Sequence, residues 1–187
     1  MGIGDAITKG IIEAIRGVKD VGLEVENMVK DLIIGALRGV KDVVGEVTSI
    51  AKDAIIGTFK GTKEIGVAAS DAVSGTVRGI VKAASETTTD VVGAAKGAVI
   101  GTVKGANEIG EDVVEVAYSA VRGAVQGVKE IGGDVTAATK ATVEGAIEAA
   151  ESIGTEAGSA VKNSLKGVID GSVDILKTPF EKKGKKK

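Results

Sequence analysis

The chain has 187 residues, of which 28 are glycine and one is proline, and it contains no cysteine, histidine or tryptophan. These absences exclude thiol nucleophiles, disulfides and imidazole acid–base chemistry, together with the usual zinc ligands. Aromatic residues make up only 2% of the chain, so the large side chains that often anchor a core are scarce. The carboxylates and lysines form no catalytic or phosphate-binding motif. We therefore expect a protein that is not an enzyme and takes no cofactor, metal or small-molecule substrate.

An eleven-residue repeat begins after a short helical start at residues 1–10. It runs from 11 to 175 as fifteen units without insertion or deletion. Apolar residues recur at positions 1, 4, 5, 8 and 11 of the unit, and position 9 is lysine in nine of the fifteen. This spacing is helical, and eleven residues make three helical turns. The pattern predicts an all-α protein built on one very long amphipathic helix.

Closely similar phrases stand at multiples of 22 residues. They are IIGALRGVKDV (33–43), IIGTFKGTKEI (55–65), VIGTVKGANEI (99–109) and VRGAVQGVKEI (121–131). Five pairs of glycines, four residues apart, follow the same period: Gly35 and Gly39, Gly57 and Gly61, Gly101 and Gly105, Gly123 and Gly127, Gly167 and Gly171. Glycines at this spacing let a second helix backbone approach closely. We predict a helix-packing role for these ten glycines; the alternative is that they are relics of duplication.

Glycine makes a continuous helix conditional on its surroundings. Each glycine costs a helix about 0.8–1 kcal/mol relative to alanine, so burial of the apolar face has to offset the loss. We therefore expect an isolated monomer to be partly or wholly disordered in water. A second copy of the same face would cover it in a hairpin or an oligomer, with the right-handed packing of eleven-residue coiled coils. A lipid surface is the other cover.

The stretch ASETTTD (84–90), which contains Thr87–Thr89, lies near the middle of the repeats and joins several poor helix formers. A turn here would fold the chain into an antiparallel helical hairpin. The eleven-residue register continues through the stretch unbroken, which favours the continuous helix.

Residues 176–187 differ in charge from the rest of the chain. They carry six lysines and one glutamate, a net of +5, whereas residues 1–175 carry 18 basic and 25 acidic groups, a net of −7. Pro179 stops the helix before this segment. We expect a basic disordered tail whose lysines attract an anionic membrane: Lys182, Lys183, Lys185, Lys186 and Lys187. A purely solubilising tail is the alternative, and the acidic body argues against nucleic acid as a partner.

The segments KGTKEIGVAA (60–69), VKGANEIG (103–110) and VQGVKEIGGDV (125–135) resemble the eleven-residue repeats of synucleins. More loosely, they resemble repeats of perilipins, exchangeable apolipoproteins and late-embryogenesis-abundant proteins. The eleven-residue spacing of apolar residues is equally similar to that of hendecad coiled coils, which are built on eleven-residue repeats. The first resemblance implies a helix that forms on phospholipid or lipid-droplet surfaces.

Three functions follow as hypotheses. The first is a structural protein whose amphipathic helix coats or scaffolds an anionic lipid surface. The second is a self-assembling helical bundle or filament, and the third is a desiccation or stress protectant. The expected partners are an anionic lipid surface and further copies of the chain. The expected location is the cytoplasm, peripheral to a membrane or lipid inclusion.

Overall fold

The computed structural model describes residues 2–14, 19–39, 41–87, 90–171, 173–178 and 180. These residues contain eight helices and no strand: α1 (Ile3–Ala14), α2 (Val21–Ile33), α3 (Val43–Ile65), α4 (Ala69–Thr87), α5 (Val91–Glu108), α6 (Val113–Glu130), α7 (Val135–Ile153) and α8 (Thr155–Ile169). The all-α prediction is confirmed. The prediction of one very long helix is wrong, because the longest helix, α3, has 23 residues.

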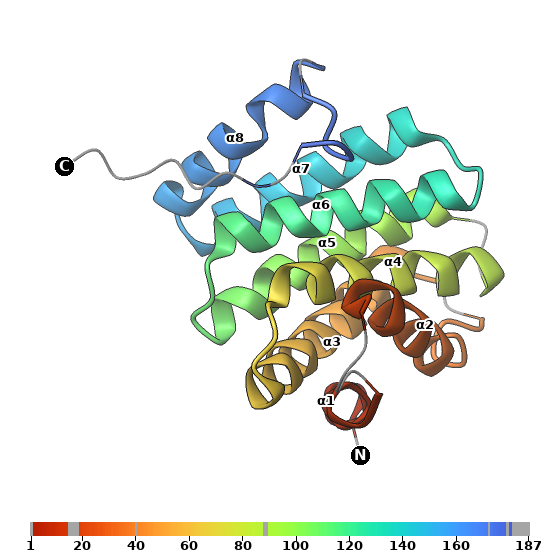
Figure 1. Ribbon diagram of the computed structural model, residues 1–187. Helices are drawn as coiled ribbons and strands as arrows, with labels where there is room; N and C mark the ends of the chain where they lie inside the picture. Colours follow the sequence, from red (N-terminus) through yellow and green to blue (C-terminus); the bar gives the residue numbers. More distant parts are fainter. Residues whose placement is uncertain are drawn as a thin grey trace.

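The helices are stacked in two layers, from α1 at one end to α8 at the other (Figure 1). In one layer α1 packs on α3, α3 on α5 and α5 on α7; in the other, α2 packs on α4 and α4 on α6. Across the two layers, α1 contacts α2, and each helix from α3 to α6 contacts the next helix along the chain. Helix α8 departs from this order because it packs mainly on α7 and less on α6. One 22-residue repeat therefore supplies one helix and one turn, and two repeats complete a unit of both layers.

Glycine and aspartate set the ends of these helices. Gly66, Gly110 and Gly132 each have a φ of 73°, a backbone conformation that glycine adopts without steric cost. The N–H that follows Gly110 donates to the carbonyl of Ala106 at 2.9 Å, which closes the last turn of α5. At the other end, an aspartate side chain accepts a hydrogen bond from the first turn of five helices: Asp20, Asp42, Asp90, Asp112 and Asp134.

The turns show that neither arrangement considered for residues 84–90, a continuous helix or a hairpin of two long helices, is correct. Helix α4 ends at Thr87 and α5 begins at Val91, so the helix does not continue there; Thr88 and Thr89 lie outside the described residues. The interruption is one of several, and the chain is a stack of short helices rather than a hairpin of two long arms. The chain forms short helices because folding back at each repeat buries the apolar face of each helix against neighbouring helices of the same chain.

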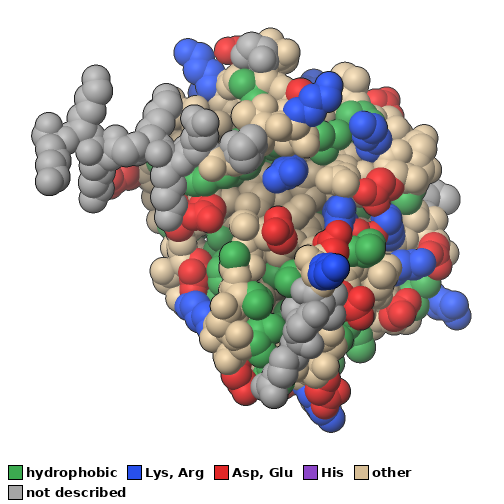
Figure 2. Space-filling view, viewed as in Figure 1, with side chains coloured by type: hydrophobic (Ala, Val, Ile, Leu, Met, Phe, Trp, Pro, Cys, Tyr) green, Lys and Arg blue, Asp and Glu red, His purple; other side chains and the backbone are tan. Residues whose placement is uncertain are grey.

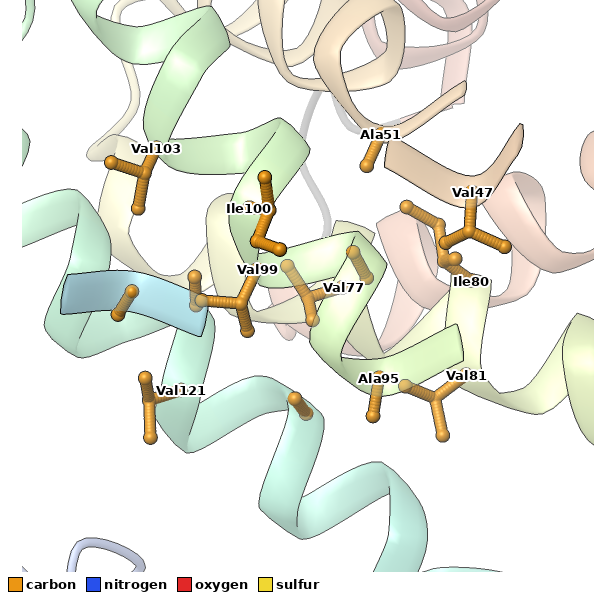
Figure 3. Packing of buried hydrophobic residues seen from close by; sticks show 14 of the residues in the cluster. Val47, Ala51, Val77, Ile80, Val81, Ala95, Val99, Ile100, Val103 and Val121 are labelled. Carbon is orange, nitrogen blue, oxygen red and sulfur yellow. The ribbon is translucent and has the colours of Figure 1, made fainter. Parts of the chain in front are cut away.

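Small and β-branched side chains make up the core. Figure 3 shows Val99 of α5 between Val47 and Ala51 of α3 on one side and Val121 of α6 on the other. Most of the buried apolar residues are alanine, valine or isoleucine. The apolar positions of the repeat are thus covered within one chain, and burial does not require the external cover expected from the sequence.

Charged side chains of both signs are interspersed on the face shown in Figure 2. Three large hydrophobic residues of the described chain are clearly exposed: Leu23 (48%), Leu32 (42%) and Ile169 (49%). Two of the three belong to α2. No helix in the described ranges combines the length and apolarity needed to cross a bilayer.

Candidate functional site: the glycine contacts and the edge of α2

Gly101 and Gly105 bring α5 against α3. A methyl group placed on Gly101 would lie 2.8 Å from the Ala51 Cβ, and one on Gly105 would lie 2.9 Å from the Lys52 carbonyl oxygen. Real Cβ atoms do not come this close to their neighbours, so only glycine fits at this separation of the two backbones.

The same contact recurs along the stack. Gly57 faces Gly4 of α1, Gly123 would place a Cβ 2.5 Å from the carbonyl oxygen of Ser74 in α4, and Gly127 would place one 3.2 Å from the Val81 Cβ. Gly61 similarly lies against Ile11. In each pair of helices the contacts advance in the same direction, so helices within a layer run parallel. The structure places these six glycines between helices of one chain rather than between copies.

The other four predicted glycines are placed differently. Gly35 and Gly39 have no atom within 4 Å of where a Cβ would be. The carbonyl of Gly167 accepts a hydrogen bond from the N–H of Val173 at 2.9 Å. Gly171 has a φ of 69° just beyond the end of α8, which is a turn position.

Several close-packed glycines were missed by the sequence analysis, among them Gly79, where a Cβ would lie 2.5 Å from the Glu26 carbonyl oxygen. Gly75 faces Gly22, a Cβ on Gly97 would lie 2.7 Å from the Val44 carbonyl oxygen, and one on Gly145 would lie 3.0 Å from the Lys96 Cγ. Gly75 and Gly97 each precede another glycine by four residues. That spacing was the signal that could have identified them.

Two copies of the same phrase have different structures. Residues 55–65 are the last half of α3, where Gly57 and Gly61 are buried against α1. In the matching residues 33–43, α2 stops at Ile33 and residues 34–39 form turns in which Gly35, Ala36 and Gly39 are exposed. Helix α3 has a neighbour at this point and α2 has none, because α2 is the first helix of its layer. We call the segment of residues 31–39, which is exposed except at Ile33, Ile34 and Leu37, the α2 edge.

The opposite end of the α2 layer is closed. Phe180 lies against Tyr118 of α6 with ring centroids 5.4 Å apart, and the Tyr118 hydroxyl donates a hydrogen bond of 2.7 Å to the Thr178 carbonyl. Leu176 also packs on the core. The segment after α8 therefore covers part of α6 that α8 leaves uncovered.

A cluster of four charged side chains joins the three helices α2, α4 and α6. The carboxylate of Glu26, only 2% exposed, lies 2.8 Å from Arg78 Nη2 and also pairs with Lys82. Lys82 Nζ lies 2.6 Å from Glu130 Oε2. Burial acts to lower the pKa of Lys82, but hydrogen bonds to Glu130 and Glu26 outweigh it, so the pKa is raised above 10.5. The cluster balances two positive and two negative charges, and such pairing is what a buried carboxylate requires.

A hollow with a volume of about 290 Å³ lies at the start of α4. Phe59 and Val73 form part of its apolar wall, and Glu111, Asp112 and Glu115 provide carboxylates. Glu111 pairs with Lys63, and Asp112 caps α6. These groups have structural partners, and no group of acidic residues in the described part of the chain is arranged to hold a metal ion.

No protein family, curated protein or solved structure matches this chain. Function must therefore be inferred from the residues themselves. The glycine contacts and the ion cluster hold helices together, and the α2 edge is the place where the repeated contact lacks a partner. The five tail lysines predicted to meet a membrane, from Lys182 to Lys187, lie outside the described residues.

Proposed function

We propose that this chain is a non-enzymatic structural protein that coats an anionic lipid surface by exchanging contacts among its own helices for contacts with lipid. In water the two layers cover each other's apolar positions. On lipid, the layers separate and the helices lie in the surface with the same positions facing the acyl chains.

The observation that carries this proposal is the register of the turns. The eleven-residue pattern continues unchanged through the turns at residues 109–112 and 131–134, which interrupt the helix. A stack of helices tolerates turns of varying length, because a few extra loop residues cost little. A helix lying on lipid requires every apolar residue to stay in phase. The unbroken register is therefore better explained by a lipid-bound helix than by the stack alone.

The small size of the core side chains also supports the exchange. Alanine, valine, glycine and threonine bury little apolar area per residue, so each helix gains a modest free energy from its neighbours. Lipid offers the same apolar positions comparable burial. We assign the lysines of residues 182–187 to the anionic headgroups, each with about 1 kcal/mol of attraction at low salt.

A disulfide that can be formed and reduced tests whether the helices must separate for the chain to bind lipid. The chain has no cysteine, so a variant with Val81→Cys and Gly127→Cys would contain one possible disulfide, between α4 and α6. A Cβ at position 127 would lie 3.2 Å from that of residue 81, a few tenths of an ångström below the usual range of about 3.5–4.5 Å. The variant would be sedimented with vesicles of anionic or zwitterionic phospholipid, oxidised and then reduced.

We expect the reduced variant to bind anionic vesicles like the unmodified chain, and the oxidised variant to bind them much more weakly. The two single-cysteine variants control for the substitutions themselves. Equal binding before and after reduction would show that separation of α4 and α6 is not needed. Absence of binding to anionic vesicles by the unmodified chain would overturn the proposed function altogether.

The other two hypotheses have less support. Assembly through the glycine pairs is less favoured because six of those ten glycines already contact helices of their own chain. A stress protectant that folds only on drying would be disordered in buffer, whereas the apolar positions here have an internal cover. Circular dichroism in lipid-free buffer separates these cases, since a protectant of that kind would show little helix.

A further inference from the structure

The α2 edge has the sequence of a packed helix and lacks the helix that would pack on it. Its counterpart in α3 contacts α1 through Gly57 and Gly61, whereas Gly35 and Gly39 face open space. We propose that the α2 edges of two copies pair around a two-fold axis, and that residues 34–39 then continue α2 as a helix. This goes beyond the proposed lipid function and does not depend on it.

The cost of glycine explains why α2 ends at Ile33. Two glycines within one turn cost a helix about 2 kcal/mol relative to alanine. In α3 this cost is offset because Gly57 and Gly61 allow close packing on α1. No neighbour provides that gain at Gly35 and Gly39, so the same phrase remains in turns. A second helix at the edge would restore it.

The composition of the edge indicates an apolar partner. Leu32 is 42% exposed, and on a continued helix it would share a face with Gly35 and Gly39, since residues three, four and seven apart lie on one side. In α3 the residue three positions before Gly57 is Ala54, so Leu32 gives the edge a larger apolar side chain beside its glycines than α3 has at the matching point. Its glycine pair matches a contact that the chain already makes four times, at α1–α3, α2–α4, α3–α5 and α4–α6.

The charges favour a second copy in the opposite orientation. Asp31 and Arg38 are both exposed, lie seven residues apart and would therefore share one side of the continued helix. A two-fold axis near Gly35 places Asp31 of each copy opposite Arg38 of the other. The edge is complementary to itself, as the interface of a symmetric dimer must be.

Head-to-tail stacking of copies is disfavoured by the far end of the molecule. The outer surfaces of α7 and α8 carry exposed polar residues, among them Lys140, Glu144, Lys162 and Asn163. Polar outer faces of this kind close the ends of helical repeat proteins. Because the pairing uses the α2 edge of both copies, no second α2 edge is left free, which limits assembly to two copies.

Exchange of the two charges tests the pairing. In a dimer, Asp31→Arg would oppose arginine to arginine, and Arg38→Asp would oppose aspartate to aspartate. We expect either single variant to weaken self-association by about tenfold or more in lipid-free buffer, because two attractive pairs become repulsive. An equimolar mixture of the two variants should dimerise again, since their edges are then complementary. The double variant, which has the original net charge, should also dimerise.

Analytical ultracentrifugation measures the association, and thermal melts establish that each variant is folded. Amide hydrogen exchange provides an independent readout: the amides of residues 34–39 should become protected as the concentration of the unmodified chain rises. Two results would overturn the proposal. One is a monomer at the highest attainable concentration in low salt. The other is association that occurs but is indifferent to the charges or is not restored by mixing.

Discussion

Glycines at one position of the repeat have opposite effects on stability in different copies of it. Gly101 is enclosed by α3, and its missing side chain is what allows the two backbones to meet. Gly35 occupies the same position of the repeat, yet nothing lies near it and its φ is outside the left-handed region. Alanine at the two sites should therefore act in opposite directions.

Gly101→Ala is expected to lower the free energy of unfolding by about 1–3 kcal/mol, because its methyl group would force α5 away from α3. Gly35→Ala is expected to raise it by about 0.4–1 kcal/mol, because alanine restricts the unfolded chain more than glycine does. Urea unfolding of dilute protein, followed by circular dichroism, measures both. If the two substitutions had equal effects, the enclosed site would not be under steric constraint.

The ion cluster predicts a dependence on acid. Burial raises the pKa of Glu130, but hydrogen bonds from Lys82 and Gln126 lower it by more, so its folded value lies below 4.5. A carboxyl group with a lowered folded pKa contributes stability that is complete above 4.5 and is lost as the pH falls through the folded value. Stability of the unmodified chain should therefore decrease as the pH falls below 4.5.

Glu130→Gln should be less stable at neutral pH and should lose less further stability on acidification. Glu148→Gln is the matched control, because Glu148 pairs with Lys96 but is 64% exposed. It should alter the pH dependence little. Urea unfolding across the acid range measures the difference, and identical pH dependences for the two variants would contradict a role for the cluster.

At the scale of single helices, α4 differs from its neighbours at its start. Ala68 precedes α4 where other helices have a capping aspartate, and alanine has no side-chain oxygen to accept the first N–H groups. The same residue lines the hollow that contains Glu111, Asp112 and Glu115. An aspartate here would add a fourth carboxylate to that hollow.

Ala68→Asn should therefore stabilise the protein by about 1 kcal/mol, because it supplies the cap without charge. Ala68→Asp should stabilise it less, and the difference should shrink as added salt screens the carboxylates. Thermal melts at low and high salt compare the two variants. Equal gains at low salt would show that the neighbouring carboxylates do not matter.

The ends of the helices were the part of the fold that the sequence analysis missed. Helical periodicity reports which face is apolar, and that face is the one buried here, as at Val47 and Val99. It does not show where a helix ends if the turn that follows keeps the eleven-residue repeat in register. The local signal was present in EIGED and EIGGD, where a left-handed glycine ends one helix and an aspartate starts the next. No short sequence motif indicates that each helix packs on the second helix after it, as α3 packs on α5, because this packing depends on how the turns direct the chain.

At the scale of the whole molecule, the stack should be most stable in its middle. Helices α4 and α5 have neighbours on both sides within their layers, whereas α1 and α2 have a neighbour on one side only. In repeat proteins stability is roughly a sum over neighbouring contacts, so the ends open first.

Amide hydrogen exchange in lipid-free buffer should show the strongest protection in α4 and α5 and progressively weaker protection toward α1. Dilute protein should be used, so that pairing at the α2 edge does not protect the end. A uniform profile would indicate that the chain unfolds as one unit. Lack of protection throughout would favour the disordered monomer expected from the sequence.

The two-layer order also bears on how the chain is made on a ribosome. Each helix finds its layer neighbour two helices later, so α1 gains its main cover as soon as α3 has left the exit tunnel. The nascent chain then never holds more than about two helices with uncovered apolar faces. Because these contacts are close in sequence, each new helix can be added to a stack that is already formed, in the order of synthesis. The first helix of the α2 layer is the exception, since no later part of the chain that the structure describes returns to cover its edge.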